Sequence, residues 1–490
     1  MQLGKILHDL PTLSDYHKEV EITSVELDSR KVRVGSLFIA LSGKNSDGKN
    51  YIPDVVKKGA LAVVYDGDYD PPAEYSHVAF IRLDGNMKEN TALIATNFYT
   101  GVPKLISAIT GTNGKTSIAD FTRQMMSSLD VKSASIGTLG VVSDGYDNVE
   151  TLTTPDSVTL HQILSDLAEK GIDYVSMEAS SIGVEQYRLD GIDIKVAGFT
   201  NFTQDHLDYH KTMEEYLRCK ELLFTRVMNS KGTVVLNADI PEYEELKNAC
   251  NERCLKVISY GYKGETLKII SRIPHTEGQS LDVEFMGNPY IFELPLVGAF
   301  QAMNALCAIG MVIALSNAQI ESIINTAINL KGAPGRLDLV GKLPNGATVY
   351  VDYAHTPDAL ENVLKTIRNH TAKDLWVVFG CGGDRDKLKR PIMGAIAAEF
   401  ADKVVVTDDN PRTEDAATIR DEVTTTCADA INIGDRAKAI EYAISNLQAG
   451  DMLVIAGKGH EDYQIIGKEK IHLSDHEEAV KAINHLEMKL

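Results

Sequence analysis

The chain has 490 residues, of which 44% are apolar and 24% charged, and 49 basic against 69 acidic side chains give a formal net charge of −20. This balance excludes the basic stripe of a nucleic-acid-binding protein, and an anionic membrane surface would repel it. The length predicts about three domains at roughly 150 residues each, and the acidic composition suits a cytoplasmic enzyme.

The N-terminal residues, the apolar windows and the cysteines indicate neither a targeting segment nor a metal site. The N-terminal residues lack the apolar core of a secretion signal, and no window reaches the ~18 apolar residues expected of a membrane span. The six cysteines are scattered, and Cys250 and Cys254 have no second ligand pair nearby. We therefore expect reduced thiols and no zinc site built on cysteine.

The first hundred residues mix short apolar runs with helical stretches, and we predict strands at 36–41, 61–65 and 78–82. From Lys104 onward, compact apolar runs alternate with helical patterns. This alternation favours a doubly wound, mostly parallel α/β sheet. Its predicted strands are Leu105–Thr110, Tyr174–Met177, Val196–Phe199 and Thr233–Leu236, and the first leads into a predicted helix at Ser117–Leu129.

Residues 257–297 alternate with period two and predict a small antiparallel patch. A helical pair, Gln301–Leu315 and Ile320–Leu330, then leads to a Gly-Pro break at 332–335 that predicts a hinge or boundary. Further strands alternating with helices give a third domain, so the fold class is α/β with expected domains at 1–102, 103–335 and 336–490. The strands predicted in the last domain are Thr348–Val351, Leu375–Phe379, Lys403–Thr407 and Met452–Ala456.

A glycine-rich turn joins the strand at 105–110 to the following helix. Glycines let backbone N–H groups close around phosphate, the helix N-terminus adds positive potential, and a lysine reaches the outer phosphates. Only two residues separate the glycines, so this is a shortened phosphate loop, but an ordinary turn has no need of Gly-Lys-Thr. We predict an ATP or GTP site, with Thr116 or Ser117 able to supply a hydroxyl to Mg²⁺. The turn consists of Gly111, Thr112, Asn113, Gly114, Lys115, Thr116 and Ser117.

Polar residues follow the next two predicted strands. Glu178 ends the strand at 174–177, at the carboxyl edge where ligands of α/β sheets gather, and a carboxylate there suits Mg²⁺. The loop at 201–210 contains Asp205, His206, Asp208 and His210, which could form a zinc cluster or a polar entry to a helix. No cysteine joins them, so the zinc alternative is weaker. Lys220, considered alone, has the pattern of a solvated helix residue.

Taken together, these segments resemble the Mur ligases, the amide-forming enzymes of peptidoglycan precursor synthesis, and most closely the members that add the third residue. The resemblance covers essentially the whole chain. Any one segment could arise by chance, but their order and spacing could not. The segments are Leu27–Arg30, Gly111–Ser117, Thr153–Pro155, Met177–Ser181, Asp205–His210, Arg336, Asp352–Pro357, Gly380–Lys387, Asp409–Arg412 and Gly457–Glu461.

The resemblance implies a first domain for the uridine nucleotide, a second for ATP and a third for the incoming amino acid, in a cytoplasmic monomer acting on small molecules. It implies Mg²⁺ ligands at Thr116, Glu178 and His206. It also implies that Lys220 is carbamylated and helps to hold a second Mg²⁺, which reverses the assignment of that residue from its own pattern. Further ATP contacts are implied at Asn304, Arg336 and Asp352, and muramoyl-dipeptide contacts at Leu27, Ser29, Thr153, Thr154, Ser180, Gln186 and Arg188.

The Asp-Asn-Pro-Arg segment is similar to the signature of members that add meso-2,6-diaminopimelate. The distal end of that substrate carries an ammonium and a carboxylate. Arg412 and Arg385 can fork onto the carboxylate, while Glu461 and Asp409 can accept the ammonium. Lysine lacks the second carboxylate, so an arginine would be left unpaired. The resemblance adds Asn410 and Gly457 to this pocket, although Asn-Pro could also be a simple turn.

The sequence departs from the family pattern at four positions, Lys49, Leu152, Ile182 and Gln301. The phosphate and metal residues remain intact, so these changes bear on nucleotide-sugar and adenine contacts. Two alternatives stay open: the same ligase with L-lysine or another diamino acid, and a nucleotide-binding paralogue without turnover. The Asp-Asn-Pro-Arg and Gly-Cys-Gly-Gly-Asp-Arg-Asp segments argue against folylpolyglutamate synthetase and against the enzyme that adds D-Ala-D-Ala.

Overall fold

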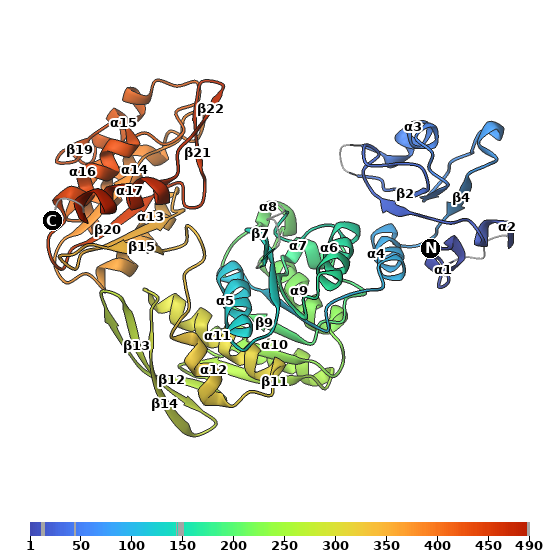
Figure 1. Cartoon of the computed structure of the whole chain (residues 1–490), viewed down its shortest axis with the longest axis horizontal. Helices are drawn as coiled ribbons and strands as arrows, with labels where there is room; N and C mark the ends of the chain where they lie inside the picture. Colours follow the sequence, from blue (N-terminus) through green and yellow to red (C-terminus); the bar gives the residue numbers. More distant parts are fainter. Residues whose placement is uncertain (11–14, 44–45, 144, 146–150, 488–490) are drawn as a thin grey trace. The chain divides into compact units, whose positions relative to one another are not determined.

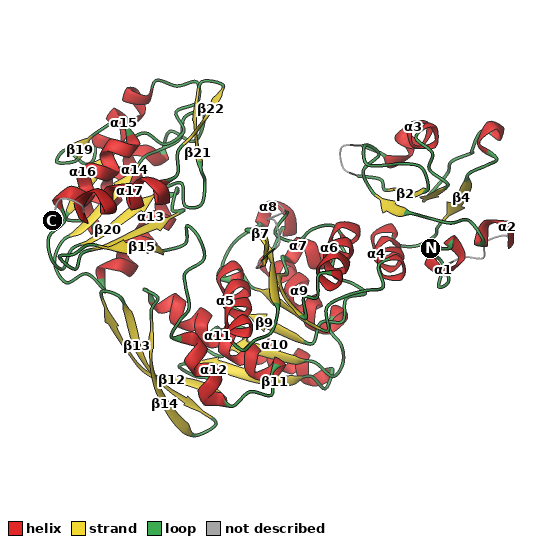
Figure 2. Cartoon of the chain, in the orientation of Figure 1, coloured by secondary structure: helices red, strands yellow, loops and turns green. Residues whose placement is uncertain are grey.

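A computed structural model of the chain describes residues 1–10, 15–43, 46–143, 145 and 151–487. The chain forms two compact units, Met1–Tyr260 with Cys307–Gln319, and Gly261–Leu306 with Ile320–Leu490. Both are α/β, with helices packed on sheets (Figures 1 and 2). Among the described residues, we find no helix with the length and apolar character needed to cross a bilayer.

The N-terminal part of the first unit is a four-stranded parallel sheet in the order β1-β2-β3-β4. The strands are buried apolar runs, which confirms the three predicted in this region, and β1 was not anticipated. The elements are α1 Leu3–Ile6, α2 Asp15–Lys18, β1 Ser24–Glu26, β2 Ser36–Ala40, α3 Ile52–Lys57, β3 Ala62–Tyr65, β4 Ala79–Arg82 and α4 Met87–Phe98.

A second sheet in this unit runs β11-β10-β9-β5-β8-β6-β7 and is parallel except for β7. It confirms the predicted mostly parallel sheet. Its strands are β5 Leu105–Thr110, β6 Ser133–Gly137, β7 Gly140–Ser143, β8 Tyr174–Glu178, β9 Val196–Phe199, β10 Thr233–Asn237 and β11 Lys256–Gly261. The helices are α5 Lys115–Ser128, α6 Ser157–Glu169, α7 Ser181–Glu185, α8 Leu207–His210, α9 Met213–Leu222 and α10 Tyr243–Glu252.

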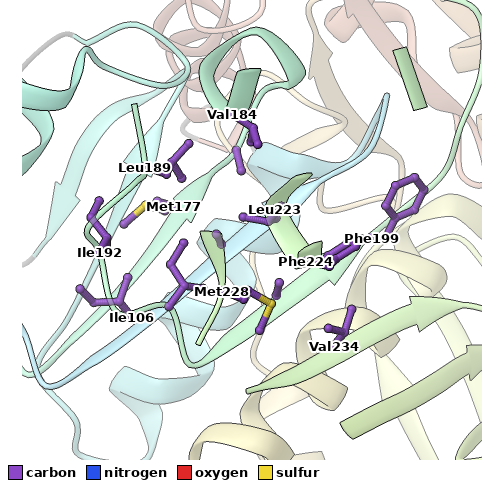
Figure 3. Packing of buried hydrophobic residues seen from close by; sticks show 14 of the residues in the cluster. Ile106, Met177, Val184, Leu189, Ile192, Phe199, Leu223, Phe224, Met228 and Val234 are labelled. Carbon is purple, nitrogen blue, oxygen red and sulfur yellow. The ribbon is translucent and has the colours of Figure 1, made fainter. Parts of the chain in front are cut away.

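One large apolar core holds this sheet against its helices (Figure 3). Ile106, Met177 and Phe199 project from neighbouring strands, and Leu223 and Phe224 close over them from the turn that follows α9. Because these side chains are almost fully buried, the ends of β5, β8 and β9 are fixed relative to one another, and so are the loops that leave them.

The second unit begins with an antiparallel meander of β12 Leu267–His275, β13 Gly278–Phe285 and β14 Asn288–Leu294. The prediction of an antiparallel patch at 257–297 was wrong at its start. Residues 256–261 form β11, which pairs in parallel with β10, and its burial rises along the strand towards Ser259, Tyr260 and Gly261 rather than alternating. Two helices follow, α11 Ala299–Leu315 and α12 Ile320–Ala327, and the second ends three residues earlier than predicted.

The rest of this unit is a six-stranded sheet in the order β15-β16-β20-β17-β18-β19, parallel except for β15. Separate apolar clusters cover its two faces, as a doubly wound fold requires. The strands are β15 Asp338–Lys342, β16 Thr348–Asp352, β17 Leu375–Phe379, β18 Lys403–Val406, β19 Ile431–Asn432 and β20 Met452–Ala456, with a hairpin of β21 Tyr463–Ile466 and β22 Glu469–His472. The helices are α13 Pro357–Arg368, α14 Lys389–Phe400, α15 Ala416–Thr424, α16 Arg436–Asn446 and α17 Asp475–Glu487.

Candidate active site

The glycine-rich turn lies between β5 and α5, as predicted. Gly114 caps α5 with φ +87°, and Gly111 has φ +134°, two conformations that side chains rarely adopt. Lys115 folds back over the turn, and its Nζ donates to the carbonyl oxygens of Thr112 at 2.7 Å and Gly111 at 3.1 Å. The backbone N–H groups at the start of a helix point along its axis, so the N-terminus of α5 is a favourable place for an oxyanion.

The loop after β9 braces this turn. The Thr112 amide donates to the Asn201 carbonyl at 2.9 Å, and the Asn113 amide donates to Asn201 Oδ1 at 2.9 Å. Thr200 Oγ1 in turn donates to the Asn113 carbonyl at 2.6 Å. A Cβ on Gly111 would lie 2.0 Å from Thr200 Oγ1, so the two segments meet only because that position is glycine.

Glu178 lies at the end of β8, beside Ile109 of β5, and is 2% exposed. Its Oε1 accepts from Thr116 Oγ1 at 2.9 Å and from the Thr138 amide at 2.7 Å. A buried carboxylate is therefore hydrogen-bonded to the hydroxyl at the start of α5, at the sheet edge where both were predicted. Hard oxygen donors held in this way suit Mg²⁺, which needs one or two carboxylates and keeps several waters.

Lys220 is 1% exposed, so the solvated position suggested by its own pattern was wrong: α9 packs this face against the central sheet. Its Nζ donates to the Gly111 carbonyl at 2.6 Å and lies 4.3 Å from the centre of the Tyr216 ring. Burial, together with repulsion from Lys115, lowers the pKa of Lys220 well below its usual value. A lowered pKa increases the fraction of the unprotonated, nucleophilic amine at any given pH.

His206 lies on the loop after β9, with its side chain 47% exposed. Its ring meets Tyr216 edge-on at 6.1 Å between centres, so it shares an aromatic neighbour with Lys220. The loop therefore brings His206 to the same side of the sheet as the phosphate loop.

Five of the residues predicted to contact the muramoyl-dipeptide substrate, Thr153, Thr154, Ser180, Gln186 and Arg188, form one hydrogen-bond network. Thr154 Oγ1 donates to the Glu178 carbonyl at 2.9 Å and accepts from the Ser180 amide at 3.0 Å. Arg188 donates to the Thr154 carbonyl at 2.7 Å and to Gln186 Oε1 at 2.9 Å. The network extends to Thr153, whose hydroxyl lies 3.2 Å from that of Thr138.

Leu27 and Ser29 lie on the segment after β1. Leu27 packs against the core of the N-terminal sheet, and the Ser29 carbonyl accepts from Lys58 at 2.7 Å. Between them, Asp28 accepts a forked hydrogen bond from Arg30, and this pairing lowers the pKa of Asp28 to about 2.

The second unit carries the remaining predicted ATP contacts. Asn304 on α11 donates to Gln301 at 2.9 Å, and both are buried. Asp352 ends β16 and accepts from the amides of Leu337 and Ala354, each at 2.8 Å. Arg336 is exposed, with its guanidinium 5.1 Å from the centre of the Tyr353 ring.

The predicted amino-acid pocket forms where β18 and β20 end. Asn410 Nδ2 donates to Glu461 at 3.4 Å, and the Gln464 side chain donates to the Asp409 carbonyl at 2.6 Å. Arg412 has φ +52° and donates to the Gly383 carbonyl at 2.9 Å. A Cβ on Gly382 would contact both Arg412, at 2.9 Å, and Arg385, at 3.8 Å, and one on Gly457 would lie 3.0 Å from Asp409 Oδ2. The six residues predicted to bind diaminopimelate thus lie on the loops that follow β17, β18 and β20, linked by these contacts.

Sequence reasoning missed several charged residues around this pocket. Lys458 is fully buried and donates to Asn410 Oδ1 at 3.1 Å. Arg436 and Asp475 form a buried, forked ion pair. Lys458 could have been found, because it lies inside the Gly-Lys-Gly-His-Glu segment, but the partners of the ion pair are 39 residues apart and have no shared pattern.

Three family models match the chain. They are the Mur ligase family catalytic domain at residues 21–99, the Mur ligase middle domain at 109–312, and the glutamate ligase domain of the Mur ligases at 335–459. The matched segments follow the three predicted domains in order.

Curated relatives match along the whole chain. The UDP-N-acetylmuramoyl-L-alanyl-D-glutamate–2,6-diaminopimelate ligase of Mesorhizobium japonicum is 46% identical over 99% of this chain and 99% of its own. The enzyme of the same name from Agrobacterium fabrum is 45% identical over 96% of this chain and 94% of its own.

Solved structures agree with this. A structure of a UDP-N-acetylmuramoyl-L-alanyl-D-glutamate–2,6-diaminopimelate ligase superposes with a TM-score of 0.77, at 32% identity, over 99% of both chains. The MurF ligase of Thermotoga maritima, at 16% identity and a TM-score of 0.60 over 98% of this chain and 100% of its own, shares the fold. The chain belongs to the Mur ligase family.

Proposed function

We propose that this chain is the ATP-dependent ligase that joins meso-2,6-diaminopimelate to the D-glutamyl carboxylate of UDP-N-acetylmuramoyl-L-alanyl-D-glutamate. The observation that carries the proposal is the hydrogen bond from Thr116 of the phosphate loop to the buried carboxylate of Glu178, beside Lys115 and Lys220. Relatives named for this reaction are 43–46% identical over at least nine-tenths of the chain, which supports the choice of substrates.

The reaction divides into two balanced steps. The D-glutamyl carboxylate attacks the γ-phosphorus of ATP, forming an acyl phosphate and releasing ADP. The unprotonated amine of diaminopimelate then adds to the acyl carbon, gives up one proton to solvent, and phosphate leaves with the C–O bond electrons as the amide forms. Lys115 binds the transferred phosphoryl oxygens, and the N-terminal amides of α5 stabilise their charge. The Thr154–Arg188 network positions the carboxylate for in-line attack.

Mg²⁺ would be held by Glu178, Thr116 and His206, and when bound it neutralises charge on the phosphates. The donors fit the ion: Glu178 Oε1 and Thr116 Oγ1 are hard oxygens already 2.9 Å apart. We expect chelation with EDTA to reduce ADP production to background and added Mg²⁺ to restore it. Full activity in excess chelator would contradict this role.

Lys220 is proposed to carry a carbamate. Its amine is buried, and burial lowers its pKa, which increases the share of the unprotonated form that can attack CO₂, losing a proton as the N–C bond forms. The resulting anion would lie at the phosphate loop and help to hold a second Mg²⁺. With ¹³C-bicarbonate, we expect a carbamate carbon signal in the NMR spectrum that disappears in Lys220→Ala. Its absence from the unmutated protein would exclude the modification.

The preference for diaminopimelate rests on charge. Arg412 and Arg385 lie together at Gly382, and Asp409 and Glu461 lie together at Asn410 and Gly457. Two cationic side chains beside two carboxylates match a substrate end that carries both a carboxylate and an ammonium. An acceptor with an ammonium alone leaves the arginines without an anion.

The decisive experiment offers meso-diaminopimelate and L-lysine in parallel, with UDP-N-acetylmuramoyl-L-alanyl-D-glutamate, ATP and Mg²⁺, and measures ADP and the ligated product. We expect efficient turnover with diaminopimelate and at least about 100-fold lower kcat/KM with lysine, since one desolvated charge pair is lost. Equal turnover would overturn the specificity.

A nucleotide-binding paralogue without turnover is the second candidate, favoured by Leu152 and Ile182, which depart from the family pattern. Leu152 is 64% exposed, at the edge of the substrate network. Phosphate release that requires all three substrates supports the ligase. Nucleotide binding without phosphate release under any combination would support the paralogue.

A further inference from the structure

A lysine is buried beneath the proposed amino-acid pocket. Lys458 follows β20 and Gly457, is 0% exposed, and donates to Asn410 Oδ1 at 3.1 Å and to the Tyr463 carbonyl at 2.5 Å. Its Nζ also lies 3.9 Å from Glu461 Oε2. A buried ammonium is costly unless it is paired, and an apolar side chain could fill the same volume. Packing alone therefore does not explain why a charged side chain occupies position 458.

The contacts of Lys458 fix the direction of the Asn410 amide. Asn410 Oδ1 accepts from Lys458 Nζ and, at 2.9 Å, from the amide of Ile465. Both partners can only donate, so the oxygen must face them. Nδ2 must then face the other way, where it donates to Glu461 Oε2 at 3.4 Å. Lys458 thus holds Asn410 as a donor towards the pocket.

Lys458 also sets the charge of the pocket. Arg436 and Asp475 neutralise each other through two contacts of 2.6 Å. Arg385 and Arg412 are assigned to the substrate carboxylate, and Asp409 and Glu461 to its ammonium. Lys458 Nζ lies near Glu461, and its positive charge offsets one of these two carboxylates. Burial lowers the pKa of Lys458, and Asp409 opposes that shift. One negative charge then faces one substrate ammonium, whereas two would favour any cation without regard to its carboxylate.

We propose that Lys458 is a specificity-positioning residue, which holds the Asn410 amide and the Glu461 carboxylate so that the pocket prefers an acceptor with both an ammonium and a carboxylate at its distal end. It acts through those two side chains and does not touch the reacting atoms. This inference rests on the proposed function, since it assumes that diaminopimelate binds here.

The test compares the unmutated enzyme with Lys458→Met, which keeps an unbranched side chain only one atom shorter and removes its charge. At saturating ATP, we expect the KM for meso-diaminopimelate to rise about 10- to 100-fold, the effect of losing a charged hydrogen bond. We expect the KM for ATP and the kcat at saturating diaminopimelate to change by less than about threefold. The ratio of kcat/KM for diaminopimelate to that for L-lysine should decrease as the KM for diaminopimelate rises. An unchanged KM and an unchanged preference would overturn the proposal.

A double-mutant cycle separates positioning from a general structural effect. If Lys458 acts through Asn410, Asn410→Ala with Lys458→Met should raise the KM little more than Asn410→Ala alone. Multiplicative effects would refute action through Asn410. Lys458→Gln, which retains a donor for Asn410, should recover part of the loss, and it replaces Lys458→Met in the cycle if that variant does not fold.

The two failures are distinguishable. If the unmutated enzyme does not ligate diaminopimelate, the proposed function is wrong. If it ligates diaminopimelate and Lys458→Met has the same KM and preference, only the role of Lys458 is wrong.

Discussion

Lys115 lies over the phosphate loop and donates to two of its carbonyl oxygens, so its amine is close to where an oxyanion would bind. Replacing it with alanine removes the cation that opposes charge on the transferred phosphoryl group. We expect Lys115→Ala to reduce kcat in ADP-coupled ligation by about 100- to 1,000-fold.

Lys104→Ala is the matched control, because that lysine lies in the same unit and is 84% exposed. It should retain the unmutated rate. Activity of Lys115→Ala within a few-fold of the unmutated enzyme would rule out the proposed role.

Burial of Lys220 makes stability depend on pH. Its pKa is 10.5 in the unfolded chain and lower in the folded one, so the unfolded chain binds more protons between the two values. The free energy of unfolding should therefore rise with pH in that window, by at most about 1.4 kcal/mol per unit. The contribution is complete above 10.5 and is lost as pH falls through the folded value.

The contribution of Lys220 to this pH dependence can be measured by urea denaturation at several pH values in CO₂-free buffer. As pH rises, we expect the free energy of unfolding of the unmutated protein to increase relative to that of Lys220→Met. Lys104→Met controls for loss of a lysine at the surface. Parallel curves for the unmutated protein and Lys220→Met would show that Lys220 is not desolvated.

Among single residues, the sequence could predict those whose neighbours along the chain define their place. Lys115 sits inside its loop, and Glu178 directly ends a buried strand. The burial of Lys220 and the Arg436–Asp475 pair could not be predicted, because both depend on contacts between segments distant in the chain. The resemblance to the family assigned a functional role to Lys220, whereas the local sequence pattern predicted a solvated residue.

The shortened phosphate loop depends on the loop after β9 for its shape. In Gly111→Ala, the new Cβ would lie 2.0 Å from Thr200 Oγ1, and φ is +134°. We expect this variant to lose about 1–3 kcal/mol of stability and to bind ATP much more weakly, since the loop must shift. Thermal unfolding and ATP titration would measure both effects.

Gly85→Ala is the control that separates the effect of a positive φ from the effect of a steric clash. Gly85 has φ +85°, but a Cβ there would meet nothing within 4 Å. We expect it to cost no more than about 1 kcal/mol and to leave ATP affinity unchanged. If both variants lost ATP affinity equally, the contact with Thr200 would not shape the loop.

Strand prediction was most accurate for apolar runs inside the sheets and missed the edge strands β7 and β15, although it found β4 at an edge and missed the buried β6. β5, β9 and β17 lie inside their sheets as continuous apolar runs, and their predicted bounds agree with the structure. β7 and β15 pair on one side only and contain exposed or half-buried residues, so they leave no comparable run. Their presence follows from the neighbouring strand and not from their own sequence.

The single tryptophan makes it possible to test whether the two units unfold together. Trp376 is 6% exposed in β17, so its fluorescence reports on the second unit, whereas far-UV circular dichroism reports on both. Chains with two compact units often unfold in more than one step. We therefore expect the two signals to give different urea midpoints.

Ligands should move these midpoints selectively. Meso-diaminopimelate at 100 times its Kd should stabilise the unit that contains Trp376 by about 2.7 kcal/mol, and should shift the fluorescence midpoint. L-Lysine at the same concentration is the control. Coincident midpoints under all conditions would mean that the chain unfolds as one cooperative body.

The carbonyl oxygen of Gly111 accepts from the amines of both Lys115 and Lys220. Two amines thus share one acceptor, and the repulsion that Lys115 exerts on Lys220 links their charges. Conversion of Lys220 to a carbamate would remove one of these hydrogen bonds and replace repulsion of Lys115 by attraction. Dissolved CO₂ would then change the electrostatic environment of the phosphate-loop lysine.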